Sequence, residues 1–382
     1  MILLEHTCAT INVTCFNRGQ CYINDDNASW SCLCPPCYAG ERCERYDNLL
    51  LHSFPSAMLI NLRESRTVNY KLLYVFCICL MVFIGLLNNI LTLQTIISKR
   101  IRSTFSGVYL LVYTISAIYI TMWLLIRTMT TFYGHKSIVQ SYAYQILNCH
   151  VLWTIHTILT SISLWISAVL AFERALIELF LFRLFGTTKI HAIMVSLTFF
   201  IFIPFCRIPT ILGKKVLSDP ADSSLFICTF RMSSLLERLE QIQAWINMLG
   251  PCIVHFLSNI LTCISIVRRK VSLSHYANSH LTYRQAWLQQ ISLHRDYFIS
   301  PLVILLCQLP HLIFFAITNT IFPCLEVKLG VYSHLHILSA LLINIPQILT
   351  FIIFIYPSKL YMREFYSSAI IEYVVKKLKQ QS

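Results

Sequence analysis

Cysteine is the residue type whose number and spacing first point to chemistry in this chain. The sequence has 16 cysteines in 382 residues, and a group of them is crowded into the first 43 residues. Thiols at this density in a short, weakly hydrophobic stretch indicate disulfides, which persist in an oxidising compartment. Glycosylation sequons at Asn12 and Asn27 agree with an amino end outside the cytosol. The crowded cysteines are Cys8, Cys15, Cys21, Cys32, Cys34, Cys37 and Cys43.

An acid–base pair occurs later in the chain, in a mostly apolar stretch. Glu173 and Arg174 are adjacent there, and charge within or beside a membrane is costly and usually serves a function. Cys149 precedes Arg174 by a helical rise of about 37 Å, which places them at opposite membrane surfaces. We expect Glu173 to hold Arg174 in a resting state and to release it to a partner. The alternative is an ordinary arginine of the cytosolic face.

One histidine is a candidate for contact with a ligand. His156 follows Cys149 by seven residues on the same apolar stretch. Its imidazole could donate or accept a hydrogen bond from a ligand. The alternative is a histidine that faces a neighbouring helix.

Signatures of enzymatic chemistry are absent from the sequence. We find no nucleophile elbow, no phosphate-binding glycine loop and no His-Glu-x-x-His pair. The chain has only nine glycines, too few for several glycine-dependent loops. The sequence therefore predicts no enzyme, no cofactor and no metal site, because the amino-terminal cysteines are better explained as disulfides than as zinc ligands.

The elements that must position these residues are membrane spans. Hydrophobic residues make up 56% of the chain and charged residues 12%, which excludes a water-soluble globular enzyme. Backbone amides in lipid must bond within their own segment, so each long apolar run is predicted to be a helix. The predicted spans are 72–97, 107–131, 148–180, 189–212, 242–268, 297–322 and 331–356.

Charge placement agrees with this topology. Most of the net charge of +13 falls on the segments that the seven spans place in the cytosol, as the positive-inside rule requires. Cations spread along a membrane face favour lipid over nucleic acid as a partner. The segment from Ser358 to Leu378 alternates apolar and basic residues at helical spacing, and we expect it to lie along the inner leaflet.

The amino-terminal head resembles an epidermal-growth-factor-like module. Its second-to-third cysteine segment, Cys15 to Cys21, and its closing turn, Tyr38 to Cys43, are similar to those of that family. Six cysteines permit fifteen pairings, and spacing alone does not choose among them. The resemblance implies the pairs Cys8–Cys21, Cys15–Cys32 and Cys34–Cys43.

Cys37 departs from the module's pattern and leaves an odd thiol in the head. The topology exposes three further cysteines to the outside, Cys149, Cys228 and Cys324. We hypothesise that Cys37 pairs with Cys324 and tethers the head over the bundle. The alternative is an unpaired or intermolecular cysteine.

The helices resemble those of rhodopsin-like G-protein-coupled receptors. In that family a disulfide cysteine precedes the arginine of an Asp/Glu-Arg-Tyr motif by the separation seen between Cys149 and Arg174. The resemblance implies a Cys149–Cys228 disulfide. Asn89 resembles the first-helix asparagine and Pro251 the fifth-helix proline. The segment 307–310, which contains Gln308 and Pro310, resembles the Cys-Trp-x-Pro hinge, and Tyr356 resembles the last-helix tyrosine.

Other positions depart from that family. Ala117 stands where a second-helix aspartate is usual, so the resemblance does not support a bound sodium ion. Gln308 replaces a tryptophan, and Tyr356 lacks the usual preceding Asn-Pro. His156 stands where amine-binding relatives have an aspartate, which disfavours a monoamine ligand. This looks like a divergent member.

These observations predict an all-α seven-transmembrane helix bundle with a small disulfide-rich head. We expect an extracellular head at 1–48, a linker at 49–71, the bundle at 72–357 and a cytoplasmic tail at 358–382. The expected function is a plasma-membrane receptor that binds an extracellular ligand, a peptide, and activates a cytosolic G protein. Charged residues of the outer loop 213–241, Lys214 among them, favour the peptide. The alternative is an adhesion protein that uses the head and keeps the bundle as an anchor, and a transporter is disfavoured because no inverted repeat is found.

Overall fold

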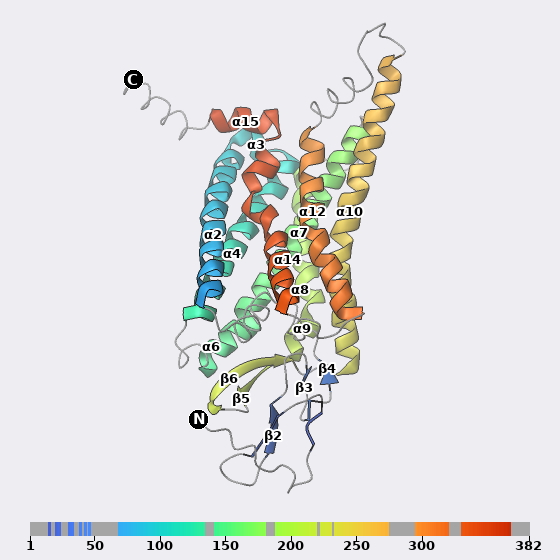
Figure 1. The fold of residues 1–382 in the computed structure, drawn as a ribbon. Helices are drawn as coiled ribbons and strands as arrows, with labels where there is room; N and C mark the ends of the chain where they lie inside the picture. Colours follow the sequence, from blue (N-terminus) through green and yellow to red (C-terminus); the bar gives the residue numbers. More distant parts are fainter. Residues whose placement is uncertain are drawn as a thin grey trace, which may run out of the picture.

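The protein is a bundle of long helices with a β-hairpin at one end and a short helix across the other (Figure 1). We call these the hairpin end and the α15 end. The computed structural model describes residues 14–16, 20–23, 30–33, 38–39, 42–43, 45–46, 68–133, 141–180, 188–219, 222–230, 233–274, 295–320 and 330–367. The tail beyond residue 367 lies outside the described residues.

The apolar runs of the sequence fold as helices. Six stretches are long and apolar enough to cross a membrane, which indicates a multi-pass membrane protein: Leu72–Ile97, Phe105–Thr130, Tyr142–Leu179, Lys189–Gly213, Arg238–Ile266 and Tyr297–Ile317. They belong to α2 (Val68–Ile97), α4 (Phe105–Tyr133), α6 (Tyr142–Ile146) with η2 (Leu147–Leu152) and α7 (Trp153–Phe180), α8 (Lys189–Cys206) with α9 (Ile208–Gly213), α10 (Ser234–Ser274) and α12 (Arg295–Thr320).

The segment predicted as the seventh span is also helical but is interrupted. It forms α14 (Gly330–Ile348) and the π-helical turn η3 (Phe351–Ile355), and its continuous apolar part, Ile337–Ile348, is shorter than the six spans. Pro346 lies inside α14 and lacks the amide hydrogen that a regular helix would use. The irregular turn that follows the proline is consistent with this loss.

Several hydroxyl side chains inside the helices donate a hydrogen bond within their own helix. Thr114 donates to the carbonyl of Leu110 at 2.7 Å, and Thr121 donates to that of Ala117 at 2.7 Å. Donation to the carbonyl four residues back removes a polar group from an apolar environment without a partner from another helix. These residues are therefore compatible with a span even though they are polar.

The core of the bundle lies between α4, α7 and η3. Tyr113 and Phe354 pack edge to face with ring centroids 5.1 Å apart, and Ile162, Ile166 and Leu170 of α7 are almost fully buried in the same cluster. By contrast, α8 exposes a series of large apolar side chains, as expected of a helix that faces lipid. These are Ile190, Met194, Leu197, Ile201, Phe202 and Phe205.

The segment 213–241, expected to supply a polar and charged outer surface, contains regular structure. It forms a hairpin of β5 (Lys214–Asp219) and β6 (Asp222–Phe230), and α10 then begins at Ser234. Glu240 is therefore a helical residue, and Lys214, expected on a polar surface, is 4% exposed. Two of the charges in this stretch, Lys214 and Glu240, are therefore buried against other elements, whereas Lys215 and Arg238 are exposed.

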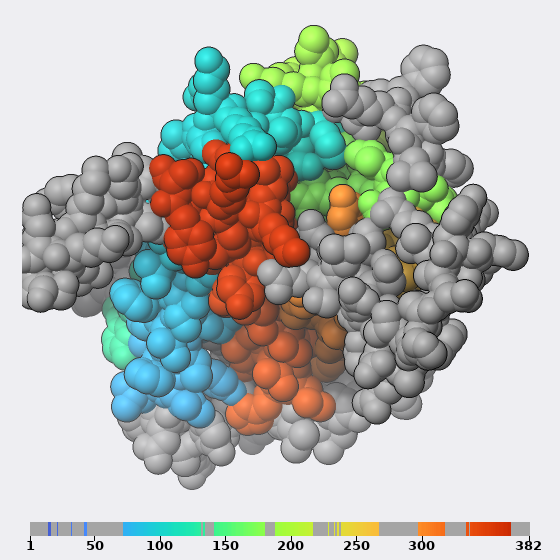
Figure 2. All heavy atoms as spheres, turned by 90° about the horizontal axis from the view of Figure 1, so that it is seen from above, coloured from blue at the N-terminus to red at the C-terminus, as the bar shows by residue number. Residues whose placement is uncertain are grey.

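At the opposite end, α15 (Lys359–Tyr366) lies across the ends of α2 and α3 (Lys99–Arg102). Figure 2 looks onto this end and shows the red residues of α15 beside the blue and cyan residues of α2 to α4. Glu364 accepts hydrogen bonds from Ser98 at 2.8 Å and from Arg100 at 3.1 Å. The apolar side of α15 packs inward, with the Phe351 and Phe365 ring centroids 4.8 Å apart. The apolar side of this part of the tail thus packs against the bundle.

The described part of the amino-terminal head consists of two small hairpins. β1 (Gln20–Ile23) pairs with β2 (Trp30–Leu33), and β3 (Tyr38–Ala39) pairs with β4 (Arg45–Tyr46), both antiparallel. A disulfide joins Cys15 to Cys32. Cys21 and Cys43 are also disulfide-bonded, and the partners predicted for them, Cys8 and Cys34, lie outside the described residues.

Candidate functional site

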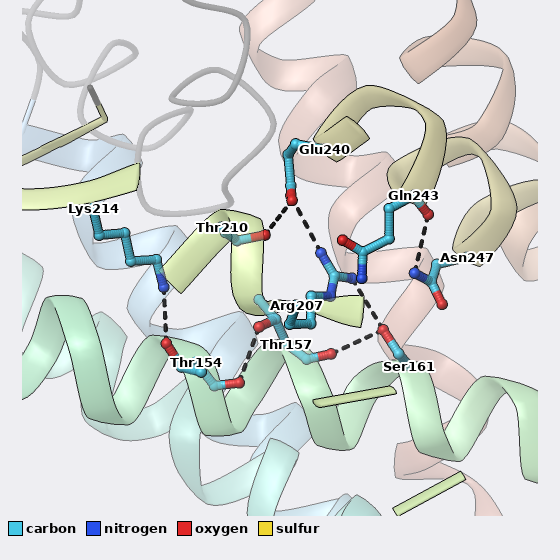
Figure 3. Close-up of polar contacts among 9 residues, drawn as sticks. All are labelled: Thr154, Thr157, Ser161, Arg207, Thr210, Lys214, Glu240, Gln243 and Asn247. Carbon is cyan, nitrogen blue, oxygen red and sulfur yellow. Dashed lines mark hydrogen bonds and ion pairs between the residues drawn. The ribbon is translucent and has the colours of Figure 1, made fainter. Parts of the chain in front are cut away.

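A cluster of buried polar side chains lies at the hairpin end, between α7, α9 and α10 (Figure 3). The residues from α7 and from α10 are separated by three or four positions, which places each set on one helical face, and the third set comes from α9 and the residues that flank it. The three faces converge, so the charged groups meet in the interior of the bundle and not at its lipid surface. The cluster comprises Thr154, Thr157 and Ser161 of α7, Arg207, Thr210 and Lys214 around α9, and Glu240, Gln243 and Asn247 of α10.

An ion pair between Arg207 and Glu240 forms the centre of the cluster. The Arg207 Nη1 and Glu240 Oε1 atoms are 3.4 Å apart, and the two side chains are 13% and 3% exposed. The guanidinium also donates to the Ser161 hydroxyl at 3.1 Å, and Thr210 donates to Glu240. These hydrogen bonds offset part of the cost of burying the pair, which joins α9 to α10 and α7.

Lys214 is the second cation of the cluster. Its ammonium donates to the Thr154 hydroxyl at 3.0 Å and lies 5.8 Å from the centre of the Trp153 ring. Burial lowers the pKa of this ammonium to about 8. The charge of Arg207 lowers it as well, whereas the Glu240 carboxylate raises it. The lysine is therefore mostly protonated at neutral pH, although the interactions described for it include no carboxylate in hydrogen-bond contact.

Gln243 supplies an amide that the described residues leave unused. Its side chain is 8% exposed, and neither the amide nitrogen nor the amide oxygen has a hydrogen-bond partner among the described residues. Figure 3 shows this amide pointing toward the guanidinium of Arg207. A buried amide without partners costs about 1–3 kcal/mol. The Gln243 amide is therefore a donor and an acceptor that the described contacts leave available.

The disulfide between Cys149 and Cys228 positions Lys214. It joins η2 to β6, with the two Cα atoms 5.8 Å apart. Cys228 pairs across the hairpin with Val216, two residues after Lys214. Because Thr154 lies just over one turn after Cys149, the bridge holds the start of β5 over the first turn of α7, where Lys214 reaches Thr154.

The sequence contained a signal for this cluster that the hydropathy interpretation did not use. Arg207, Thr210 and Lys214 repeat at helical spacing, and so do Glu240, Gln243 and Asn247. Both sets stand at the ends of apolar runs, where the predicted spans stopped at 212 and started at 242. A polar stripe that extends a span by one or two turns is the pattern that could have identified them.

His156, predicted as a ligand contact, lies beside the cluster on α7. Its ring stacks on that of Trp123 from α4, with centroids 5.4 Å apart, and its Nδ1 atom has no hydrogen-bond partner among the described residues. Arg127, also on α4, donates to Asn148 at 3.0 Å in the same region. His156 is therefore an aromatic contact between α4 and α7, and its unused ring nitrogen leaves the predicted ligand contact untested.

Glu173 and Arg174 lie at the α15 end of α7, but they bind different partners. Tyr109 donates to Glu173 at 2.8 Å, and the Nδ1 atom of His191 lies 3.5 Å from the same carboxylate oxygen. Arg174 donates to the Tyr361 hydroxyl at 3.2 Å. Among the described residues no ion pair joins Glu173 to Arg174, so the expected switch pair is divided between α4 and α8 on one side and α15 on the other.

The predicted hinge residues connect α10 and α12. Gln308 is 3% exposed and accepts a hydrogen bond from the Cys252 thiol at 3.1 Å. Cys252 follows Pro251, and Gln308 precedes Pro310 by two residues, so this contact lies beside a proline inside each helix. Tyr356, by contrast, follows η3 and is 56% exposed, so it does not share the burial of Gln308.

Asn89, which the sequence interpretation singled out, connects α2 to α14. Its amide nitrogen donates to the Gln347 carbonyl at 3.0 Å, and its oxygen accepts from Thr350 at 2.6 Å.

The glycosylation sites Asn12 and Asn27 and the hypothetical pair Cys37 and Cys324 lie outside the described residues.

The chemistry available at both ends is hydrogen bonding and charge recognition. A search of the described residues finds no group of three or more His, Cys, Asp or Glu side chains that could hold a metal ion. No protein-family model and no curated protein sequence matches this chain. The site must therefore be interpreted from its own geometry.

Proposed function

We propose that this chain is a divergent rhodopsin-like G-protein-coupled receptor that spans the plasma membrane seven times. In this proposal the hairpin end faces outward and binds an extracellular ligand, and the α15 end faces the cytosol and binds a G protein. The amino-terminal head is an epidermal-growth-factor-like module, and α14 with η3 is the seventh span. Heterotrimeric G protein, the ligand and membrane lipid are the partners.

The observation that carries this proposal is that one helical rod connects the two ends. The stretch Tyr142–Leu179 is long and apolar enough to span a membrane, bears the Cys149–Cys228 bridge near its start and ends just after Arg174. The buried polar cluster contacts this rod through Thr154 and Ser161. A displacement of the rod at the hairpin end is therefore carried to the arginine at the other end.

The mechanism is a shift between two states of the bundle. A ligand can shift such an equilibrium only by its difference in affinity for the two states. In this proposal the described arrangement is the resting state, in which Arg174 donates to Tyr361 and the Cys252 thiol of α10 donates to Gln308 of α12. In the active state Arg174 leaves Tyr361 and α12 pivots at Pro310, which opens a pocket for the G protein.

Nucleotide exchange on a panel of G proteins, with the full chain in cells and a ligand library, tests this function. We expect at least one G protein to respond, and we expect Arg174→Ala to reduce the response at least ten-fold. Arg102→Ala is the matched control, because Arg102 is an exposed cation at the same end and should leave the response unchanged. No response across the library, or equal responses from Arg174→Ala and the parent chain, would contradict the proposal.

A further inference from the structure

We infer that the buried cluster at the hairpin end binds a ligand through a single carboxylate, held by Lys214 with help from Arg207 and Gln243. This inference rests on the proposed function only in treating the hairpin end as the ligand side. The chemical class of the ligand follows from the charges and the unused hydrogen-bonding groups of the cluster.

The first argument is a charge imbalance. The cluster contains two cations, Arg207 and Lys214, and one carboxylate, Glu240, which is bonded to Arg207 and Thr210. Lys214 is 4% exposed and donates to a neutral hydroxyl. A buried ammonium that has no carboxylate in hydrogen-bond contact among the described residues is costly, so its position favours an anion supplied by a ligand.

The second argument is the free hydrogen-bonding capacity beside that charge. The ammonium has three donors, of which the described contact with Thr154 uses one. The Gln243 amide and the Arg207 Nε atom have no partner among the described residues. These donors belong to the one cluster drawn in Figure 3, and a carboxylate offers two oxygens that charged donors bind strongly.

The third argument concerns the size of the charge. One cation in excess matches one negative charge, which is the charge of a carboxylate. A phosphate monoester carries about −1.5 to −2 at neutral pH and would exceed the positive charge that the cluster has in excess. The disulfide-held hairpin fixes the position of Lys214 in advance, which reduces the entropy lost when a ligand binds.

Two sources can supply such a carboxylate: the carboxyl end of a peptide or the head of a fatty acid. The test uses the full chain in phosphatidylcholine nanodiscs without G protein, and thermal unfolding gives the affinity of each probe. One pair of probes is N-acetyl-leucine and N-acetyl-leucinamide, and the other is decanoate and decanamide. We expect the carboxylate of one pair to bind at least ten-fold more tightly than its amide, and the pair that binds identifies the source.

The variants separate charge recognition from stability. Lys214→Met should weaken carboxylate binding at least ten-fold, whereas Lys214→Arg should retain most of it. Lys215→Met is the matched control, because Lys215 is the exposed neighbour. Gln243→Leu should weaken binding several-fold and raise the unfolding temperature of the unliganded chain, since it removes a buried amide without partners. If Lys214→Met does not fold, carboxylate binding by Gln243→Leu tests the inference instead.

Four results would overturn the inference: no binding by either carboxylate, equal binding by carboxylate and amide, unchanged binding by Lys214→Met, or unchanged binding by Gln243→Leu. These results are independent of signalling. If the carboxylate binds but Arg174→Ala leaves nucleotide exchange unchanged, the site stands and the proposed function fails. If exchange depends on Arg174 but no carboxylate binds, the proposed function stands and the site fails.

Discussion

Arg174 of α7 donates a hydrogen bond to the hydroxyl of Tyr361 of α15, 3.2 Å away, across 187 positions of sequence. The guanidinium carbon also lies 5.8 Å from the centre of the Tyr361 ring. The arginine is therefore held by the helix that follows η3, and the adjacent Glu173 accepts a hydrogen bond from Tyr109. In the proposed mechanism, Arg174 must break this hydrogen bond to α15 before it can bind the G protein.

Removal of the Tyr361 hydroxyl should raise basal signalling. Tyr361→Phe keeps the ring, which is 5% exposed, but deletes the acceptor for Arg174 and so destabilises the resting state. The loss of one hydrogen bond to a charged group, about 1.5–3 kcal/mol, would raise basal nucleotide exchange roughly ten-fold or more. Tyr366→Phe, on the exposed part of the same helix, is the control. Basal exchange equal to that of the parent chain would contradict the role of this contact.

The buried ion pair should matter far more for stability than the ion pair at the α15 end. Glu240→Gln leaves the buried Arg207 cation without a counter-charge, which costs about 3–5 kcal/mol. Glu364→Gln is the matched change, because its partner Arg100 is 59% exposed, and it should cost at most about 1 kcal/mol. Thermal unfolding of the two variants in nanodiscs measures the difference, and equal losses would show that the Arg207–Glu240 pair is not effectively buried.

Asn89 and its neighbour Asn88 offer a second matched comparison. Asn89→Ala removes two hydrogen bonds between α2 and α14 and leaves buried polar groups behind, at a cost of about 1–3 kcal/mol. Among the described residues Asn88 donates to the Ile84 carbonyl of its own helix and to no other helix, so Asn88→Ala should cost about 1 kcal/mol or less. The unfolding temperatures of the two variants report the difference. A larger loss for Asn88→Ala would mean that α14 does not depend on this contact.

The stability of the unliganded chain should depend on pH through Lys214. Its pKa is lowered from 10.5 to about 8, so the unfolded chain binds more protons than the folded chain between these values. Stability that is present above pH 10.5 is therefore lost as the pH falls to about 8, and no further change from this group occurs below that. The unfolding temperature of the parent chain relative to Lys214→Met should rise between pH 8 and pH 10. A constant difference over that range would exclude the lowered pKa.

The sequence alone located the spans well because lipid imposes one local requirement on every residue of a span. Six of the seven predicted runs fall in helical stretches long and apolar enough to cross a membrane, since a backbone without water must satisfy its own hydrogen bonds. The seventh is the interrupted stretch of α14 and η3. The Cys149–Cys228 bridge followed from a resemblance in spacing, and the structure contains it. Such features depend on residues that are close in sequence or on a separation fixed by helical rise.

Tertiary structure alone decided which polar groups are buried and what they bind. The sequence predicts a surface position for Lys214. The residue is buried because the bridged hairpin, α7 and α10 converge around it. Likewise, nothing in the sequence near Arg174 indicates Tyr361 as its partner. Hydropathy reports the average preference of a residue for water or lipid. The partner that makes a buried charge tolerable comes from a distant segment, and only the packing of the helices brings it there.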